Sequence, residues 1–245
     1  MRDDRGLPRE EDRLPPVPRV RVDMDRPRVT LNCAMTADGK TALPSRRQLR
    51  ISSEEDRARV YELRQACDAV LIGVETVLAD DPKLTVSDTY VKKPRQPLRV
   101  VLDGSCRTPP DALAVNDAAP TLIFTKPGCQ KRYPGEHVEV VACPPDAEGL
   151  LDLHWILREL HSRGIRRLLV EGGGTVLWSF LQQGLFDDFF VYVGPMVVGG
   201  KGTPTLAAGR GVASESETIR LCLRSVQRLG AGVLLQYQPE EKEVS

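Results

Sequence analysis

Short apolar runs that alternate with helical patterns are the feature of this 245-residue sequence that most constrains its fold. Residues 69–73 (AVLIG), 98–102 (LRVVL) and 121–124 (TLIF) are typical of strands that are buried on both faces of a sheet. A helical pattern over residues 153–163 ends at Gly164, a residue type that often follows the last turn of a helix. This alternation predicts an α/β fold with a mostly parallel central sheet that is flanked by helices.

Further strands are predicted near both ends of this pattern. Residues 28–34 alternate apolar and polar side chains, and residues 165–170 form a second apolar run that leads into a helix. Three late strands, at residues 189–193, 225–229 and 233–237, follow one another without a helix between the last two. They therefore predict antiparallel strands at an edge of the sheet.

One amphipathic helix is marked by its first residues. Ser52 or Ser53, with an acidic residue three positions later, forms a capping box. The helix that follows carries Val60, Leu63 and Cys67 on one side, and we expect this stripe to be buried.

The composition divides the chain into one domain and two polar ends. Residues 1–26 are rich in Arg, Asp, Glu and Pro without apolar periodicity, so we expect a flexible charged arm. Residues 239–245 are interpreted as a polar tail, and residues 27–238 as a single domain.

The charge balance and the apolar stretches exclude several kinds of partner. With 34 Lys+Arg against 34 Asp+Glu, the chain has no one-signed field of the kind that binds nucleic acid or an anionic membrane surface. Its longest uncharged apolar stretch, residues 189–200, is shorter than the about 20 residues that a membrane-spanning helix needs. No secretory signal is recognised at the start, and the six cysteines are scattered without a CxxC pair. We therefore expect a cytoplasmic protein.

A glycine turn at residues 168–178 (LLVEGGGTVLW) is the most informative local motif. It is either a phosphate cradle, because glycines let backbone N–H groups approach a phosphate, or a plain turn between a strand and a helix. It is not the Rossmann fingerprint, since Leu177 stands where the third glycine would be needed.

Other polar residues remain ambiguous on local grounds. Asp80 and Asp81 follow a strand and form a metal pair, an acceptor for a substrate or, as we favour, a turn before Pro82. Lys40 follows an Asp-Gly turn and is either solvated or functional, while Arg64 lies at the edge of a buried helix stripe. The three histidines have no partners at metal-ligand spacing, so we predict no metal site.

Taken in order, these motifs become recognisable. The succession NCAMTADGK (32–40), TVLADDP (76–82), EGGG (171–174) and GLFD (184–187) resembles the reductase family of riboflavin biosynthesis, and the resemblance covers residues 28–237. Members of that family are similar to dihydrofolate reductase in fold. They use NADPH to reduce the ribose of a pyrimidine nucleotide to ribityl.

The resemblance implies a set of site residues. Lys40 and Asp80 are implied as polar catalytic residues, without a metal. The residues implied to bind the dinucleotide are Ala34, Thr76, Asp80, Gly104, Glu171, Gly172, Gly173, Gly174 and Thr175. The positions implied to meet the substrate are Asn32, Lys40, Arg64, Leu84 and Ser87.

Two positions depart from the family pattern. Many members have an arginine where this chain has Ser87, and that arginine would face the substrate phosphate. Arg46, Arg47 and Lys83 are open as replacements. Arg50 stands where a tryptophan is common in the bifunctional bacterial members.

The resemblance also implies a substrate and an assembly. No deaminase signature is found, so the chain is similar to the stand-alone archaeal or fungal type, in which reduction precedes deamination. The implied substrate is 2,5-diamino-6-ribosylamino-4(3H)-pyrimidinone 5′-phosphate, and the implied assembly is a homodimer. Two alternatives remain: a reductase of 5-amino-6-(5-phosphoribosylamino)uracil acting after deamination, or a non-catalytic nucleotide-binding module of the same fold. A pteridine reductase of this fold is disfavoured by the paired TVLADDP and EGGG motifs.

Overall fold

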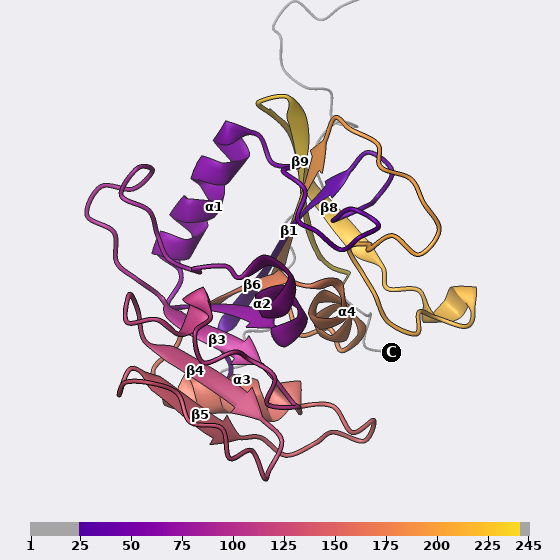
Figure 1. Cartoon of the computed structure of the whole chain (residues 1–245). Coiled ribbons are helices and arrows are strands. Elements are labelled where there is room, and N and C mark those ends of the chain that lie inside the picture. Colours follow the sequence, from indigo (N-terminus) through magenta and orange to yellow (C-terminus); the bar gives the residue numbers. More distant parts are fainter. Residues whose placement is uncertain (1–24, 241–245) are drawn as a thin grey trace, which may run out of the picture.

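A computed structural model describes residues 25–240, whose strands form one sheet with the order β5-β4-β3-β2-β6-β1-β7-β9-β8 (Figure 1). The strands are β1 (Arg28–Thr36), β2 (Ala69–Gly73), β3 (Leu98–Leu102), β4 (Thr121–Thr125), β5 (Val138–Ala142), β6 (Arg167–Gly172), β7 (Asp188–Gly194), β8 (Leu221–Leu229) and β9 (Gly232–Pro239). The helices are α1 (Glu54–Ala66), α2 (Val74–Asp80), α3 (Leu153–Ser162) and α4 (Gly174–Gln182), with short 3₁₀ turns at Leu113–Val115 and Glu215–Glu217.

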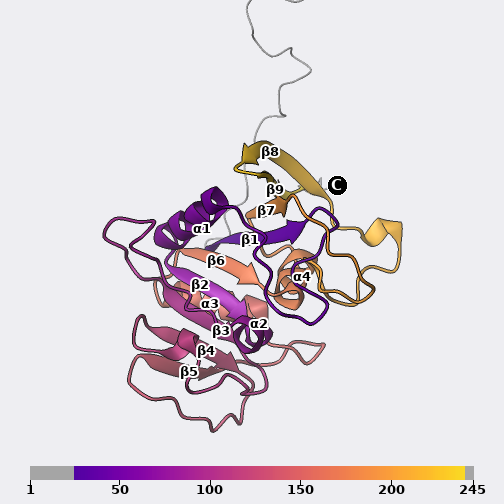
Figure 2. The ribbon, with the colours of Figure 1, turned by 45° about the horizontal axis from the view of Figure 1, so that its top comes forward.

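The direction of the strands confirms the predicted fold class. All pairings from β5 through to β7 are parallel, whereas β9 pairs antiparallel with β7 and β8. Figure 2 shows the whole sheet, with β8 and β9 at one end and β4 and β5 at the other. The fold is therefore α/β, mostly parallel, with an antiparallel edge.

Two elements were not predicted from the sequence. Strand β5 lies at the opposite edge and has exposed residues, so it lacks the continuous apolar run of a buried strand. Helix α2 begins directly after β2, and the residues that we interpreted as a turn form its end. Asp81 does end this helix, in a left-handed conformation with φ of 42°, and Pro82 follows.

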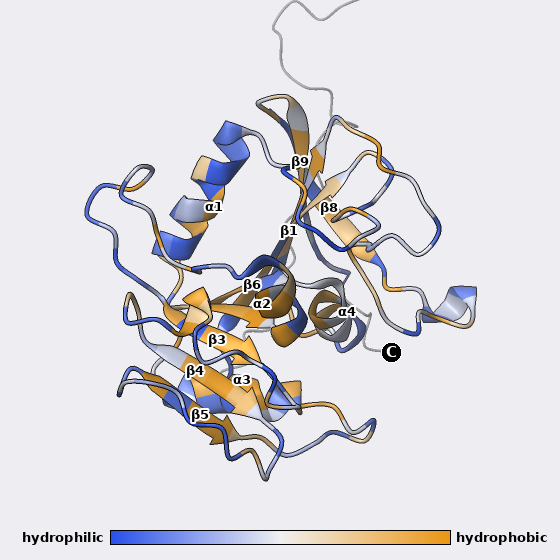
Figure 3. Cartoon of the chain, viewed as in Figure 1, coloured by the Kyte–Doolittle hydropathy of each residue, from blue (hydrophilic) through white to orange (hydrophobic). Residues whose placement is uncertain are grey.

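The core lies on both faces of the sheet. One cluster joins β1, β3 and β4 to the apolar sides of α3 and α4, while a second joins β2 and β6 to α2 on the other face. Figure 3 shows the contrast between the hydrophobic central strands and the largely hydrophilic α1.

The burial expected for α1 is wrong for most of its stripe. Val60 and Leu63 are only half-buried, whereas Cys67 is buried directly after the helix. The buried residue of the helix itself is Asp56, whose carboxylate accepts hydrogen bonds from Ser52 Oγ at 2.5 Å and Arg59 Nε at 2.9 Å. One side of α1 borders an open cavity rather than the core. Polar contacts, more than apolar burial, therefore hold this helix in place.

Most of the expected arm and tail lie outside the described residues. Within the described part, Arg26 forms a two-pronged ion pair with Asp187, at 2.8 and 2.9 Å. Asp187 also accepts a hydrogen bond from Val29 N at 2.7 Å, so the chain is tied to the sheet where β1 begins. Within residues 25–240, no helix has the length and apolar character needed to cross a membrane.

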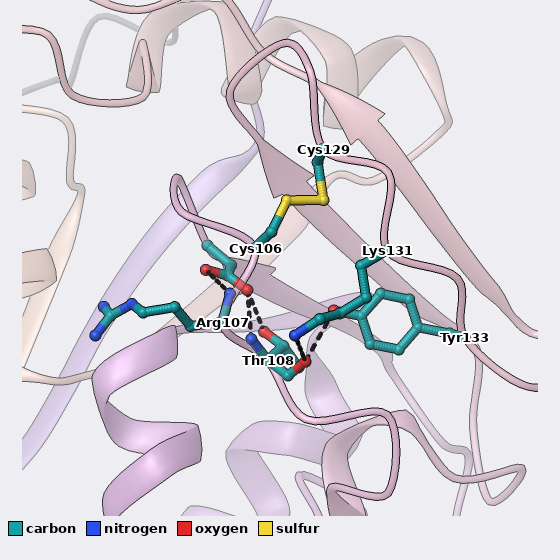
Figure 4. Close-up of a disulfide and its surroundings, with 7 residues drawn as sticks. Cys106, Arg107, Thr108, Cys129, Lys131 and Tyr133 are labelled. Carbon is teal, nitrogen blue, oxygen red and sulfur yellow. Dashed lines mark hydrogen bonds between the residues drawn. A yellow bond between two sulfur atoms is a disulfide. The ribbon is translucent and has the colours of Figure 1, made fainter.

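The cysteines divide into buried thiols and one pair. Cys33 and Cys67 are buried, the latter as predicted, and Cys222 is half-buried. A disulfide joins Cys106, after β3, to Cys129, after β4, with their Cα atoms 5.9 Å apart (Figure 4). The scattered spacing of the cysteines gave no sign of this pairing.

Candidate active site

A cavity of about 1480 Å³ opens at the carboxyl ends of the parallel strands. Strands β2 and β6 are neighbours in the sheet, and each runs into a helix without a loop. Ligands of parallel α/β sheets bind at this edge, because the loops and helix N-termini gather there. The cavity exceeds the about 300–1,000 Å³ of drug-sized pockets, so it has room for two ligands.

Glycines are required where the two helices begin. A Cβ atom on Gly73 would lie 2.8 Å from Val176 Cγ2, and one on Gly174 would lie 2.6 Å from the carbonyl oxygen of Thr205. Gly172 has a φ of +112°, and its peptide bond to Gly173 is cis. Gly73 thus lets the start of α2 pack closely against Val176 of α4, and Gly174 lets the start of α4 pack against the segment around Thr205.

The N-terminus of α4 is open toward the cavity. Its N-cap residue is Gly173, and no side chain caps the helix. The first backbone N–H groups of a helix lack partners within the helix, so here they are available to an anion. Gly172, Gly173, Gly174 and Thr175 all line the cavity.

Glu171 and Arg64 form an ion pair at the cavity wall. Arg64 donates from Nε and Nη2 to the two oxygens of Glu171, each at 2.7 Å, and from Nη1 to Thr85 O at 3.0 Å. Burial alone would lower the pKa of Arg64, but the Glu171 carboxylate raises it above its usual value. The Arg64 guanidinium is therefore not simply solvated. Its ion pair with Glu171 links α1 to the end of β6.

The structure brings most of the implied site residues to this one cavity. Those that line it are Ala34, Lys40, Arg64, Thr76, Asp80, Gly104, Glu171, Gly172, Gly173, Gly174 and Thr175. They come from β1, α1, α2, β6, α4 and the loops after β1 and β3. Their individual roles remain predictions.

Three implied substrate positions do not line the cavity. The side chain of Asn32 is buried and accepts a hydrogen bond from Arg59 Nη2 at 2.7 Å. Leu84 is 1% exposed and packs in the core beside α2. Ser87 lies in the loop after α2, where its Oγ accepts from Thr89 N at 3.3 Å. Direct contact of these side chains with a ligand in the cavity is thus not supported.

Asp80 and Asp81 have separate surroundings. Asp80 lines the cavity at the end of α2, and burial raises the pKa of its carboxyl. Asp81 instead accepts a hydrogen bond from Leu113 N at 2.7 Å. Of the two carboxyls, that of Asp80 is therefore the one at the cavity.

Within residues 25–240, no three His, Cys, Asp or Glu side chains gather in a way that could hold a metal ion.

The Asp-Gly turn positions Lys40 at the cavity. Asp38 accepts hydrogen bonds from Thr36 Oγ1 at 2.6 Å, Gly199 N at 2.7 Å and Val198 N at 3.1 Å. The hydrogen bond from Thr36, with those from the two backbone groups, lowers the pKa of Asp38 to about 2. Lys40 then pairs through its backbone with Thr205. The turn thus joins the loop after β1 to the segment after β7.

Several residues that line the cavity were missed from the sequence. Lys126 directly follows β4, and Arg107 follows β3. Their positions after parallel strands were the signal that could have found them. Thr205, by contrast, lies in an irregular segment and carries no such signal.

The chain matches the family model described as the RibD C-terminal domain over residues 27–235. It is 43% identical over 219 residues to a 2,5-diamino-6-ribosylamino-4(3H)-pyrimidinone 5′-phosphate reductase of Methanothermobacter thermautotrophicus, covering 86% of this chain and 98% of that protein. A protein of the same name from Archaeoglobus fulgidus is 40% identical over 214 residues, covering 84% of this chain and 95% of that protein.

Solved structures agree in fold. A diaminohydroxyphosphoribosylaminopyrimidine deaminase/5-amino-6-(5-phosphoribosylamino)uracil reductase of Thermotoga maritima has a TM-score of 0.75 at 29% identity; the match covers 88% of this chain but only 57% of that one. The Rib7 riboflavin biosynthesis reductase of Saccharomyces cerevisiae has a TM-score of 0.70 at 20% identity, covering 88% and 90% of the two chains. Sequence and fold agree: the chain belongs to the RibD C-terminal reductase family.

Proposed function

We propose that this protein reduces the ribosyl group of 2,5-diamino-6-ribosylamino-4(3H)-pyrimidinone 5′-phosphate to ribityl with NADPH, in riboflavin biosynthesis. The observation that carries the proposal is that one cavity is lined both by an uncapped helix N-terminus at a glycine turn and by charged side chains from α1 and the loop after β1. Two relatives that cover most of the chain bear the name of this reductase.

The cavity fits a dinucleotide on structural grounds. A Cβ on Gly173 would lie 3.2 Å from Thr76 Oγ1, so glycine leaves the most room for a phosphate at the N-terminus of α4. Lys126 lies over Gly104, with its Cε 3.6 Å from where a Cβ would stand, and Arg107 lines the same end of the cavity. Arg107 already pairs with Glu75. Lys126 is therefore the cation there that favours NADPH over NADH, because the 2′-phosphate adds two negative charges.

The reaction does not require a covalent bond between the protein and the substrate. The glycosylamine opens to an imine at ribose C1′, and NADPH, when bound, supplies the hydride that this carbon accepts. The cavity walls then have to hold the reactants together and exclude water. The nitrogen of the new amine needs one proton, for which we propose Lys40 Nζ or the Asp80 carboxyl as the donor. Asp80 suits this role because burial raises its pKa.

The order of the two pathway steps is part of the proposal. The two archaeal relatives named for the diamino compound are 43% and 40% identical, whereas the Thermotoga maritima protein named for the uracil compound is 29% identical. This supports reduction before deamination. From the resemblance we further expect a cytoplasmic homodimer.

The test is turnover with product identification. The purified chain should oxidise NADPH only when the diamino substrate is present, and one ribitylamino product should form for each NADPH consumed. NADH should give a kcat/KM at least about tenfold lower, since Lys126 then loses its charged partner. Tight binding of both ligands without any product would instead indicate a non-catalytic nucleotide-binding module.

A further inference from the structure

The proposed substrate carries a phosphate dianion, and the structure shows which cations remain available for it. This inference rests on the proposed function. Seven cationic side chains line the cavity: Lys40, Arg46, Arg50, Arg57, Arg64, Arg107 and Lys126. Arg64 is paired with Glu171 and Thr85, and Arg107 is paired with Glu75. Lys126 lies at the Gly104 end, and Lys40 is a proposed proton donor.

We propose that Arg46, Arg50 and Arg57 form the subsite that binds the 5′-phosphate of the substrate. They come from the segment that joins β1 to α1, drawn in indigo in Figure 1, and from the first turn of α1. Three residues were candidates to replace the arginine that many family members have at the position of Ser87. Arg46 is favoured among them, because it lines the cavity whereas Arg47 and Lys83 do not.

Arg50 and Arg57 already converge on a single anion. Arg50 Nη2 and Arg57 Nη1 lie 3.4 Å and 3.2 Å from the same oxygen, Oε2 of Glu54. Glu54 does not line the cavity and its side chain is 60% exposed, so an anion bound in the cavity can compete with it for the two guanidinium groups. A phosphate oxygen suits two guanidinium groups that meet in this way, since their planar donors match its geometry.

Arg46 lies on a tight turn at the edge of the cavity. Ala42 and Gln48 pair as an isolated bridge, and the turn is closed by hydrogen bonds between Leu43 and Arg47 at 3.1 Å and from Arg46 N to Leu43 O at 2.8 Å. Arg46 itself has a φ of 63°, which non-glycine residues seldom adopt and which is often found at ligand sites. Within residues 25–240, no carboxylate pairs with it, so its charge is available.

The first experiment measures binding of ribose 5-phosphate by calorimetry, with ribose as the uncharged probe. Arg46→Ala and Arg57→Ala should each weaken ribose 5-phosphate binding by about tenfold, as expected for a lost charge-assisted hydrogen bond. Arg47→Ala, a matched arginine on the same turn, should leave the affinity unchanged. Glu54→Gln should strengthen binding by about threefold, because a competing anion is removed.

The second experiment measures kinetics with the diamino substrate. Arg46→Ala and Arg57→Ala should raise KM by about tenfold while kcat stays within twofold, and circular dichroism confirms that each variant is folded. Equal losses in Arg46→Ala and Arg47→Ala, or wild-type affinity in both Arg46→Ala and Arg57→Ala, would overturn the subsite. So would the absence of ribose 5-phosphate binding by the unmodified chain. If ribose 5-phosphate binding follows the predicted pattern but no NADPH is oxidised, the subsite stands and the proposed function fails.

Discussion

One wall of the cavity is formed mainly by backbone atoms, and the other mainly by charged side chains. One is backbone: Gly73 and the glycines at 172–174 end two buried parallel strands and start two helices. The other consists of long charged side chains on α1 and on the loop after β1, such as Arg46 and Arg64. In the glycine wall, side chains at Gly73 and Gly174 would meet neighbouring atoms. In the arginine wall, the loss of one cation can be compensated by another. The absence of an arginine at Ser87 fits this difference.

The largest effect is expected where the glycine wall is filled. Gly173→Asp places a carboxylate at the N-terminus of α4, beside Thr76. It opposes both the close approach and the positive end of the helix, so the Kd for NADPH should rise at least about a hundredfold, or about 2.7 kcal/mol. Fluorescence titration of the folded variant measures this.

Gly173→Ala is the matched control for charge. Its Cβ would lie 3.2 Å from Thr76 Oγ1, a contact that a small shift can relieve. The Kd should therefore change by less than about tenfold, or about 1.4 kcal/mol. Unchanged NADPH affinity in the aspartate variant would move the cofactor cradle away from this turn.

The next largest effect concerns the Arg64–Glu171 ion pair, which links the two walls. Glu171→Gln leaves Arg64 charged but without its carboxylate, and both side chains are mostly buried, at 12% and 14% exposure. Removing one partner of a buried pair costs about 3–5 kcal/mol, and we expect about 2 kcal/mol here because the cavity admits water. For a chain of this size the Tm should fall by about 4–8 °C.

An exposed ion pair gives the contrast within the same chain. Arg163 bonds Glu139 and Glu159 at 2.7 Å, but its side chain is 31% exposed and that of Glu139 is 56% exposed. Arg163→Ala should cost less than about 1 kcal/mol in the same thermal melts. Similar costs for Arg163→Ala and Glu171→Gln would mean that the pair at the cavity is not structural.

The difference between the walls also explains what the sequence could predict. The strands from β1 to β4, the Gly164 helix end and the glycine turn were all predicted, because apolar periodicity and glycine requirements are local signals. Helix α2 was missed since only seven residues form it, and β5 was missed because an edge strand need not be apolar.

The site was only partly predictable for a related reason. Asn32 and Leu84 occupy positions that the resemblance assigns to the substrate, yet their side chains are buried. The Arg64–Glu171 pair joins residues 107 positions apart, so no local pattern reveals it. Which cations face the cavity depends on the turn at Arg46, whose left-handed backbone is not marked by a glycine.

The smallest effect is a pH dependence at the turn that links the loop after β1 to the segment after β7. Its hydrogen bonds lower the pKa of Asp38 from 3.8 to about 2. A lowered carboxyl pKa contributes stability that is present above the unfolded pKa and is lost as the pH falls through the folded one. Asp38→Asn should therefore be less stable than the unmodified chain at pH 6, and the difference should shrink between about pH 4 and pH 2. Urea melts across this range measure it, and a constant difference would contradict the assignment.

The central claim is that this cavity reduces a diaminopyrimidine nucleotide, and steady-state kinetics on two substrates test it most directly. One enzyme preparation is given NADPH with either 2,5-diamino-6-ribosylamino-4(3H)-pyrimidinone 5′-phosphate or its deaminated 5-amino-6-(5-phosphoribosylamino)uracil analogue. A site that hydrogen-bonds the 2-amino group leaves a polar partner unpaired when that group is absent, which costs orders of magnitude in kcat/KM. We predict NADPH oxidation with the diamino compound at a kcat/KM at least about a hundredfold above that of the analogue. No oxidation with the diamino compound, or a clear preference for the deaminated one, would contradict the claim.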